Sequence, residues 1–264
     1  MNIDQMTEHE DKLVTSMGKA FLCERTVFRG KDLHHDLGGL DWFQLYFYSI
    51  TGRILNEKES KLLNYYWVAT SYPDPSIWPN HVASLAGSVR STASLSLMAG
   101  LAISEASIYG RRPERRALDF FYRAGDLLGN GLSLEALVES ELKQNKTIYG
   151  YGRPLAKMDE RVPHTLKLVS ELGLDGGKYL KIALDLYQYL KETKGLSMNI
   201  AAIDAALAAD AGLQPEEYQL FMTPCFIAGI VPCYIDARDK PEGSFFPVRC
   251  ESIVNKGSIR REWD

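Results

Sequence analysis

Apolar side chains recur along most of this chain at the three- and four-residue spacing of amphipathic helices. In residues 56–70, for example, Leu62, Leu63 and Tyr66 fall on one helical face, as packing against a core requires. Helices are therefore predicted over residues 41–51, 56–70, 81–109, 112–127, 134–145, 160–173, 177–194, 198–212 and 215–236. Residues 26–28 are β-like, but strand alternation never runs beyond five residues. The pattern predicts an all-α fold.

Two segments interrupt this helical spacing of apolar residues. In residues 147–154, Gly150 and Gly152 flank an aromatic residue and a proline follows, which predicts an ordered loop whose backbone comes close to a ligand. The second segment, residues 239–264, is a tail with an apolar run at 245–248. It is predicted to dock on another surface, a second subunit being one candidate.

Composition narrows the class of protein. The 264 residues are 45% hydrophobic and 24% charged, enough for one large domain with a smaller lobe. A formal net charge of −4 does not favour nucleic acid as a partner. The apolar run at residues 221–235 holds two prolines and is about 15 residues long, which predicts a buried, kinked helix and no membrane span.

The cysteines and the N-terminus indicate a cellular compartment. Cys23, Cys225, Cys233 and Cys250 show no C-x-x-C spacing, so they read as reduced thiols of a cytoplasmic protein. The first twelve residues are polar and acidic, unlike a signal peptide. Neighbouring His34 and His35 would diverge on a helix, and no metal site is predicted.

Five short segments carry a resemblance to a known family. They are Phe28-Arg29-Gly30-Lys31-Asp32-Leu33, Thr51-Gly52-Arg53-Ile54, Ala83-Ser84-Leu85-Ala86-Gly87-Ser88, Gly150-Tyr151-Gly152 with Lys157, Asp159 and Arg161, and Ser197-Met198-Asn199-Ile200. Their order over roughly residues 28–250 resembles the citrate synthase superfamily, in particular its short members of the citryl-CoA lyase type. The fourth resembles the family loop G-[FY]-G-H-x-x-x-[KR]-x-x-D-P-R, one residue shorter.

The resemblance implies an architecture and a chemistry. It implies an all-α homodimer with a large lobe at approximately residues 20–145 and 215–264 and a small lobe at approximately 146–214. It also implies an acyl-CoA substrate and an anionic carboxylic acid as its partner, with no tightly bound cofactor. The family's reaction uses an aspartate base and two histidines.

This chain departs from the family at each of those three reacting positions. The histidine that stabilises the enol is replaced by Tyr109, and the histidine that polarises the ketone by Arg153. The base aspartate is replaced by Ala201, which cannot accept a proton. Losing one such group costs about 10²–10⁴-fold in rate, so ordinary citrate synthesis is not expected.

Other matching positions keep suitable residues. The resemblance implies that Gly150, Tyr151 and Gly152 hold the adenine of CoA through their backbone and that Lys157 meets a phosphate. It also implies that Arg161 binds a substrate carboxylate and that Arg249 reaches across the dimer to do the same, since a guanidinium matches a carboxylate at two points.

Three candidate catalytic residues follow. Tyr109, with an unperturbed pKa near 10, would donate a hydrogen bond, or it is a core tyrosine. Arg153 would bind an anionic acceptor or a phosphate, or it is a surface arginine. Asp204 shares a helical face with position 201, so it would be a relocated base, or it pairs with a nearby arginine.

Three interpretations remain open. The first is a diverged enzyme that forms or cleaves a carbon–carbon or thioester bond of an acyl-CoA next to an anionic acid. The second is an inactive homologue that binds CoA or a metabolite or acts as a scaffold. The third is an unrelated helical protein.

Overall fold

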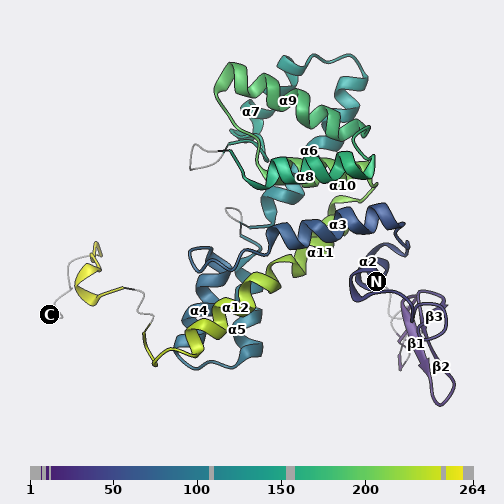
Figure 1. Ribbon diagram of the computed structural model, residues 1–264, viewed down its shortest axis with the longest axis vertical. Coiled ribbons are helices and arrows are strands. Elements are labelled where there is room, and N and C mark those ends of the chain that lie inside the picture. The colour runs from purple at the N-terminus through teal and green to yellow at the C-terminus, as the bar shows by residue number, and fades with distance from the viewer. Residues whose placement is uncertain are drawn as a thin grey trace. The chain divides into compact units, whose positions relative to one another are not determined.

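The computed structural model describes residues 7, 10–11, 13–106, 110–152, 158–244 and 248–257, and the chain divides into two compact units. Unit 1 is Met1–Asn64 and unit 2 is Tyr65–Asp264. The fold is mostly helical (Figure 1), which confirms the expectation from the apolar spacing. The boundary between the units differs from the predicted lobe boundaries, and the lobes stay a prediction.

Unit 1 contains a small antiparallel sheet with its strands in the order β1-β2-β3. The strands are β1 (Gly18–Phe21), β2 (Arg25–Phe28) and β3 (Lys31–Asp32). Gly18 faces Phe28 across the first pair. Arg29 and Gly30 turn the chain between β2 and β3 with φ angles of 46° and 80°. The β-like reading of residues 26–28 is confirmed.

The sheet is hydrogen-bonded to the end of helix α2 (Trp42–Thr51) through Arg29 and Tyr48, whose hydroxyl donates to the carbonyl of Arg29 at 3.0 Å. Arg29 donates from Nε to the carbonyl of Ser49 and from Nη2 to that of Ile50, at 2.9 and 2.8 Å. Gly52 then ends the helix in the left-handed conformation, with φ 72°, where glycine carries no Cβ penalty. Two of the segments that carry the resemblance thus meet within unit 1.

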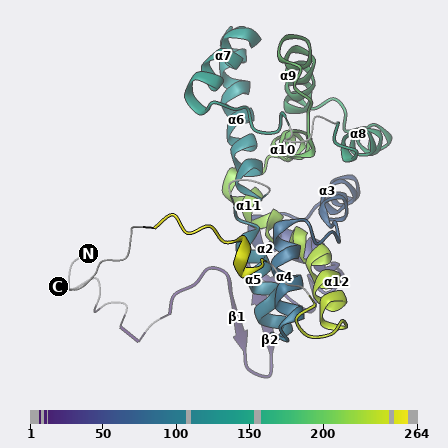
Figure 2. The same cartoon turned by 90° about the vertical axis from the view of Figure 1, so that its left-hand side faces the viewer.

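Helix α3 (Glu57–Thr70) continues into unit 2, where three further helices pack side by side. They are α4 (Trp78–Ser88), α5 (Ala93–Ile103) and α12 (Ile227–Arg238), seen together in Figures 1 and 2. Small residues allow this close approach. A Cβ on Gly87 would lie 2.6 Å from the carbonyl oxygen of Tyr234.

The prediction of one helix over residues 81–109 is wrong. Helix α4 ends at Ser88, and the chain turns at Arg90, whose φ is 59°. Helix α5 then starts behind Thr92, whose hydroxyl accepts a hydrogen bond from the next turn, as a helix N-cap does. The small residues that suggested one continuous helix instead line the contacts between two helices.

A second group of helices in unit 2 has α10 at its centre and α7 packed on α6. Its members are α6 (Arg112–Gly129), α7 (Leu134–Asn145), α8 (Arg161–Leu172), α9 (Lys178–Lys194) and α10 (Ile200–Asp210). Helix α10 packs against α6, α8 and α9, and most of its side chains are buried, alanines being the commonest among them. Its small side chains bring the backbones of its neighbours close to it.

The last predicted helix, over residues 215–236, is interrupted. Helix α11 (Pro215–Met222) passes into the 3₁₀ turn η1 (Thr223–Phe226) before α12, and a further turn η2 (Cys250–Ser252) follows. By length and composition, Pro215–Arg238 could cross a membrane, but 44% of its apolar window is buried within the protein. An apolar core helix passes the same test, so this is weak evidence for a span.

Candidate functional site

The loop at residues 148–152 is built for close contact with α10. Gly150 and Gly152 both have positive φ, at 91° and 86°, which disfavours any residue with a side chain. A Cβ on Gly150 would lie 2.6 Å from the Cβ of Ala202 and 2.7 Å from its Cα. At Gly152 the nearest atom would be Leu196 Cδ2, at 3.6 Å. Only Gly150 is therefore required by packing as well as by conformation.

Backbone hydrogen bonds fasten this loop to the residues before α10. Gly152 N–H donates to the carbonyl of Ser197 at 2.7 Å, and Asn199 N–H donates to the carbonyl of Gly150 at 2.9 Å. The Asn199 side chain adds a bond from Nδ2 to the Gly152 carbonyl at 3.1 Å. Two sequence segments that carry the resemblance, some 50 residues apart, therefore form one structural node.

The aromatic residue of the loop has a structural role. Tyr151 is buried and its hydroxyl donates to the carbonyl of Ala183 at 2.8 Å. Its backbone pairs with Met198 in an isolated antiparallel bridge. The ring therefore packs into the core and is not available to stack on a ligand, and the CoA-binding role of the loop stays a prediction.

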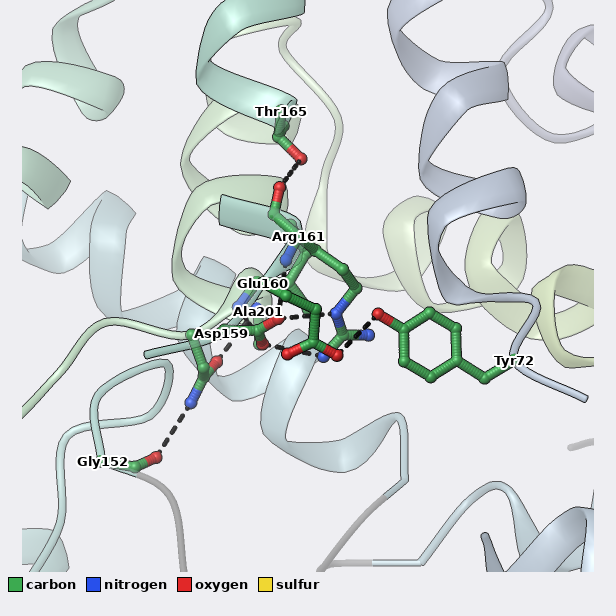
Figure 3. Close-up of polar contacts among 9 residues, drawn as sticks. Tyr72, Gly152, Asp159, Glu160, Arg161, Thr165 and Ala201 are labelled. Carbon is green, nitrogen blue, oxygen red and sulfur yellow. Dashed lines mark hydrogen bonds and ion pairs between the residues drawn. The ribbon is translucent and has the colours of Figure 1, made fainter. Parts of the chain in front are cut away.

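Asp159 and Arg161 form the central ion pair of the site (Figure 3). Arg161 donates from Nε to Oδ1 and from Nη2 to Oδ2 of Asp159, at 2.9 and 2.8 Å. Ile200 N–H, at the start of α10, donates to Oδ2 at 3.0 Å. The Asp159 side chain is fully buried and that of Arg161 is 20% exposed. One carboxylate thus joins the start of α8 to the start of α10.

The pKa values of this pair reflect that arrangement. Burial opposes ionisation of Asp159, but the hydrogen bonds and charge of Arg161 and the Ile200 N–H outweigh it, so its pKa lies below the usual value. Burial likewise disfavours the charge on Arg161, and Asp159 outweighs it, so its pKa is raised. Both groups are therefore charged at neutral pH.

Arg161 keeps donors for a ligand. A guanidinium has five N–H donors, and Asp159 takes two of them. The guanidinium also lies over the ring of Tyr72, 5.2 Å from its centroid. Tyr72 donates its hydroxyl to Glu160 Oε1 at 2.9 Å. Arg161 is thus held in one orientation, as binding a substrate carboxylate would need.

The position of the family's base lies beside this pair. Ala201 is in the first turn of α10, and its N–H donates to Asn199 Oδ1 at 3.0 Å. Figure 3 shows it close to Asp159 and Arg161. An alanine thus lies next to the ion pair, and its match to the position of the family's base stays a prediction.

Asp204, one turn further along α10, is buried and only 2% exposed. Burial first, and then the charge of Glu114, raise its pKa well above the ordinary value, against the opposing charge of Arg161. A protonated carboxyl donates a proton and cannot act as a base. The base role proposed for Asp204 is therefore disfavoured, and its catalytic role stays a prediction.

The other predicted residues are only partly located. Tyr109, Arg153 and Lys157 lie outside the described residues. Arg249 is exposed just before η2, and the described part of the chain does not bring it to the Asp159–Arg161 pair. Its role across a dimer stays a prediction.

Sequence reasoning did not single out Asp159, Asn199 or Glu114 as site residues. Their signals were present: the D-x-R spacing before α8, an asparagine at a helix start, and a glutamate in the first turn of α6. Among the described residues, no group of three or more His, Cys, Asp or Glu side chains is placed to hold a metal ion.

Comparison with known proteins gives a family and a fold. The family described as "Citrate synthase, C-terminal domain" matches residues 3–235. A search of curated proteins by sequence found no match.

Solved structures of similar fold include three relevant proteins. Citryl-CoA lyase from Hydrogenobacter thermophilus matches with a TM-score of 0.81 and 21% identity, over 96% of this chain and 97% of that one. Methanosaeta concilii ATP citrate lyase (D541A mutant), in complex with (3S)-citryl-CoA, matches with a TM-score of 0.75 and 17% identity, over 98% of this chain and 45% of that one. Citrate synthase from Thermotoga maritima MSB8 matches with a TM-score of 0.66 and 16% sequence identity, over 85% of this chain and 60% of that one.

Proposed function

Because this chain belongs to the citrate synthase family, we propose that it binds an acyl-CoA and forms or cleaves a carbon–carbon or thioester bond next to an anionic carboxylic acid. The observation that carries this proposal is the node that joins Gly150 and Gly152 to Asn199 beside the Asp159–Arg161 pair. The node holds the loop next to the start of α10, where Asp159 also fixes the guanidinium of Arg161.

The proposed roles follow the chemistry of each residue. The backbone of Gly150, Tyr151 and Gly152, with Lys157, holds CoA. Arg161 binds a carboxylate of the acid, and Arg249 adds a second cation from a partner subunit. Tyr109 and Arg153 replace the family's histidines as hydrogen-bond donors.

Ordinary citrate synthesis is not part of the proposal. Ala201 cannot remove a proton from the thioester, and burial, which raises the pKa of Asp204, disfavours the ionised form that a base would need. A citryl-CoA-like thioester is a candidate substrate in either direction, because the similar citryl-CoA lyase covers nearly the whole of both chains.

A second candidate function is a catalytically inactive homologue that binds CoA or a metabolite or acts as a scaffold. The observation that favours it is the alanine at position 201, in the same first turn of α10 that holds the intact Asp159 and Asn199 contacts. The hydrogen bonds that shape the site are kept, whereas the proposed reacting group at position 201 is missing.

One experiment separates the two candidates. Binding of CoA is measured by calorimetry, and oxaloacetate release from (3S)-citryl-CoA by a coupled malate dehydrogenase assay. Thiol release from acetyl-CoA with a panel of 2-oxo acids tests the reverse direction. We expect turnover with at least one substrate, and a loss of about 10²-fold or more in a Tyr109→Phe/Arg153→Ala variant.

The matched control is Lys181→Ala, an exposed cation on α9, which should leave turnover unchanged. CoA binding without any turnover would favour the inactive homologue. If neither binding nor turnover is detected, both candidates fail.

We also propose a homodimer, with α5 in its interface. Leu95 and Met98 are 66% and 65% exposed, and Ala99 and Ala102 continue the same helical stripe at solvent. An apolar stripe of this kind marks an interaction surface.

Light scattering of the wild-type protein should give twice the chain mass, and a Leu95→Glu/Met98→Glu variant should be monomeric. A Lys181→Glu control should remain dimeric; a monomeric wild-type protein at micromolar concentration would contradict the proposal.

The proposed site uses small molecules, and neither nucleic acid nor a membrane has a part in it. Acyl-CoA is a substrate here, with no tightly bound cofactor. A cytoplasmic location stays a prediction from the cysteine pattern.

A further inference from the structure

The buried carboxyl groups of unit 2 fall into two kinds. Asp159 and Glu141 are each held by an arginine through two N–H groups, from Arg161 and Arg123 respectively. Glu114 on α6 and Asp204 on α10 are as deeply buried. Within the described residues, however, Glu114 Oε2 and Asp204 Oδ1 have no hydrogen-bond partner. A buried carboxylate without a partner is costly, whereas a protonated carboxyl is much less so.

The groups around this pair are hydrogen-bond donors that also have unused capacity. In the described part of the chain they are Tyr66 Oη on α3, Tyr218 Oη on α11, and Nε and Nη1 of Arg111 at the start of α6. All three side chains are buried. These groups are close enough to influence one another's pKa: Glu114, Asp204 and Tyr66 act on Tyr218, and Arg111 and Arg161 act on Glu114. Buried groups from four helices therefore lie near one another and near Arg161.

The nearby cations are already engaged. Arg161 is clamped by Asp159, and Arg111 donates from Nη2 to Glu105 at 3.1 Å. Both lower the pKa of Glu114 by their charge, but neither forms a hydrogen bond to it that offsets its burial. Cys225, in η1, is a buried thiol whose pKa is raised by burial and by the charge of Glu114.

The remaining elements packed on α6 and α10 bring their charged groups to other places. On α7, Glu141 is neutralised by Arg123. On α9, the N–H of Tyr179 donates to Asp210 at the far end of α10, at 2.9 Å. Lys178 lies near Gly125, three turns along α6 from Glu114.

We propose that Glu114 and Asp204 form a coupled carboxyl pair that keeps at least one proton at neutral pH and is the proton store of this site. The proton lies one helical turn from position 201, where the family's base is absent. Its use in a reaction rests on the proposed function, but the presence of the proton does not.

The order of ionisation follows from burial and mutual repulsion. Burial raises the pKa of Glu114 to about 7 in spite of Arg111 and Arg161. Once Glu114 is charged, it adds to the effect of burial on Asp204, whose pKa is raised further. Two like charges in one buried site cannot both form easily, so the pair keeps one proton after the first carboxyl has ionised.

The sign of the pH dependence is fixed by these directions. Between the unfolded pKa of a glutamate, about 4.3, and a folded value of about 7, the folded chain binds more protons than the unfolded one. The stability of the wild-type protein therefore falls as the pH rises through this window. Glu114→Gln and Asp204→Asn remove the ionisation and keep the shape of the protonated acid.

Urea unfolding from about pH 5 to about pH 8 tests the pair. The unfolding midpoint of each variant, relative to wild type, should rise with pH over that range. In Glu114→Gln, Asp204 should titrate at a lower pH than it does in the wild-type protein. The control Glu141→Gln removes the charge of a clamped buried pair and should instead lower the midpoint at neutral pH.

A second measurement needs only the wild-type chain and Asp204→Asn. Unfolding in weak buffer at neutral pH should release about one proton per chain more from the wild type than from the variant. The proposal of a proton-holding pair would be contradicted by equal proton release from the wild type and Asp204→Asn. Variant midpoints that keep a constant offset from wild type at every pH would contradict it as well. Neither measurement uses a substrate, so the turnover assay can fail while the pair stands.

Discussion

Replacing Asp159 with alanine should lower the free energy of unfolding by about 3–5 kcal/mol, the cost of breaking a buried ion pair from one side. The carboxylate is fully buried and holds both the Arg161 guanidinium and the Ile200 N–H. Without it, a largely buried cation and an N–H at the start of α10 lose their acceptor. Urea denaturation followed by circular dichroism measures the loss.

The matched control is a second ion pair, which lies on α8, the helix that begins at Arg161. Lys167 and Glu171 in α8 pair at 3.7 Å, but both are largely exposed, so Glu171→Ala should cost less than about 1 kcal/mol. The double variant Asp159→Ala/Arg161→Ala should recover part of the loss, because it removes the stranded cation. Equal losses for Asp159→Ala and Glu171→Ala would contradict the central place given to Asp159.

The stabilisation by Asp159 also has a predicted pH dependence. Its folded pKa lies below the ordinary value, so its contribution is present above the unfolded pKa of about 3.9. The contribution is lost as the pH falls from there through the folded pKa. The gap between wild type and Asp159→Asn should therefore close in acid, the opposite trend to that expected for Glu114.

Replacing Gly150 with alanine should destabilise the protein by about 2–5 kcal/mol, the sum of a backbone term and an overpacking term. The positive φ of 91° strains any side chain. In addition, the new Cβ would meet the backbone of Ala202, at 2.7 Å from Cα and 2.8 Å from N. Helix α10 would have to move away from the loop.

Gly152→Ala is the control for that prediction. Its φ is nearly the same, 86°, but a Cβ there would be 3.6 Å from the flexible Leu196 side chain. Only the backbone term applies, about 1–2 kcal/mol. Urea unfolding of the two variants compares them directly. If both cost the same, packing of the loop against α10 does not matter.

The helical class of this fold was readable in the sequence. Amphipathic spacing in segments such as residues 134–145 and 177–194 predicts elements that the structure confirms almost residue for residue. The apolar faces are local in sequence, and a helix is the structure that buries them together. The family was also readable, because the glycine loop and the segment at Asn199 keep their order.

Helix ends inside runs of small residues were harder to read. Residues 81–109 carry no proline, and the local signal of the turn at Arg90 is the short polar stretch at 88–92 with the Thr92 cap. That turn exists because α4 and α5 pack against each other and against α12. Contacts between residues more than 100 positions apart decided it.

The sequence by itself determined the helical class and the positions of most helices, because these depend on residue type and local spacing. Only the tertiary structure decided the roles of the acids. Asp159, Glu114 and Asp204 are all carboxylic acids, yet the arginine beside Asp159 lowers its pKa, whereas burial raises the pKa of Asp204. The ionisation of a carboxyl group depends on its burial and its neighbours in space, and those are set when α6, α8 and α10 come together.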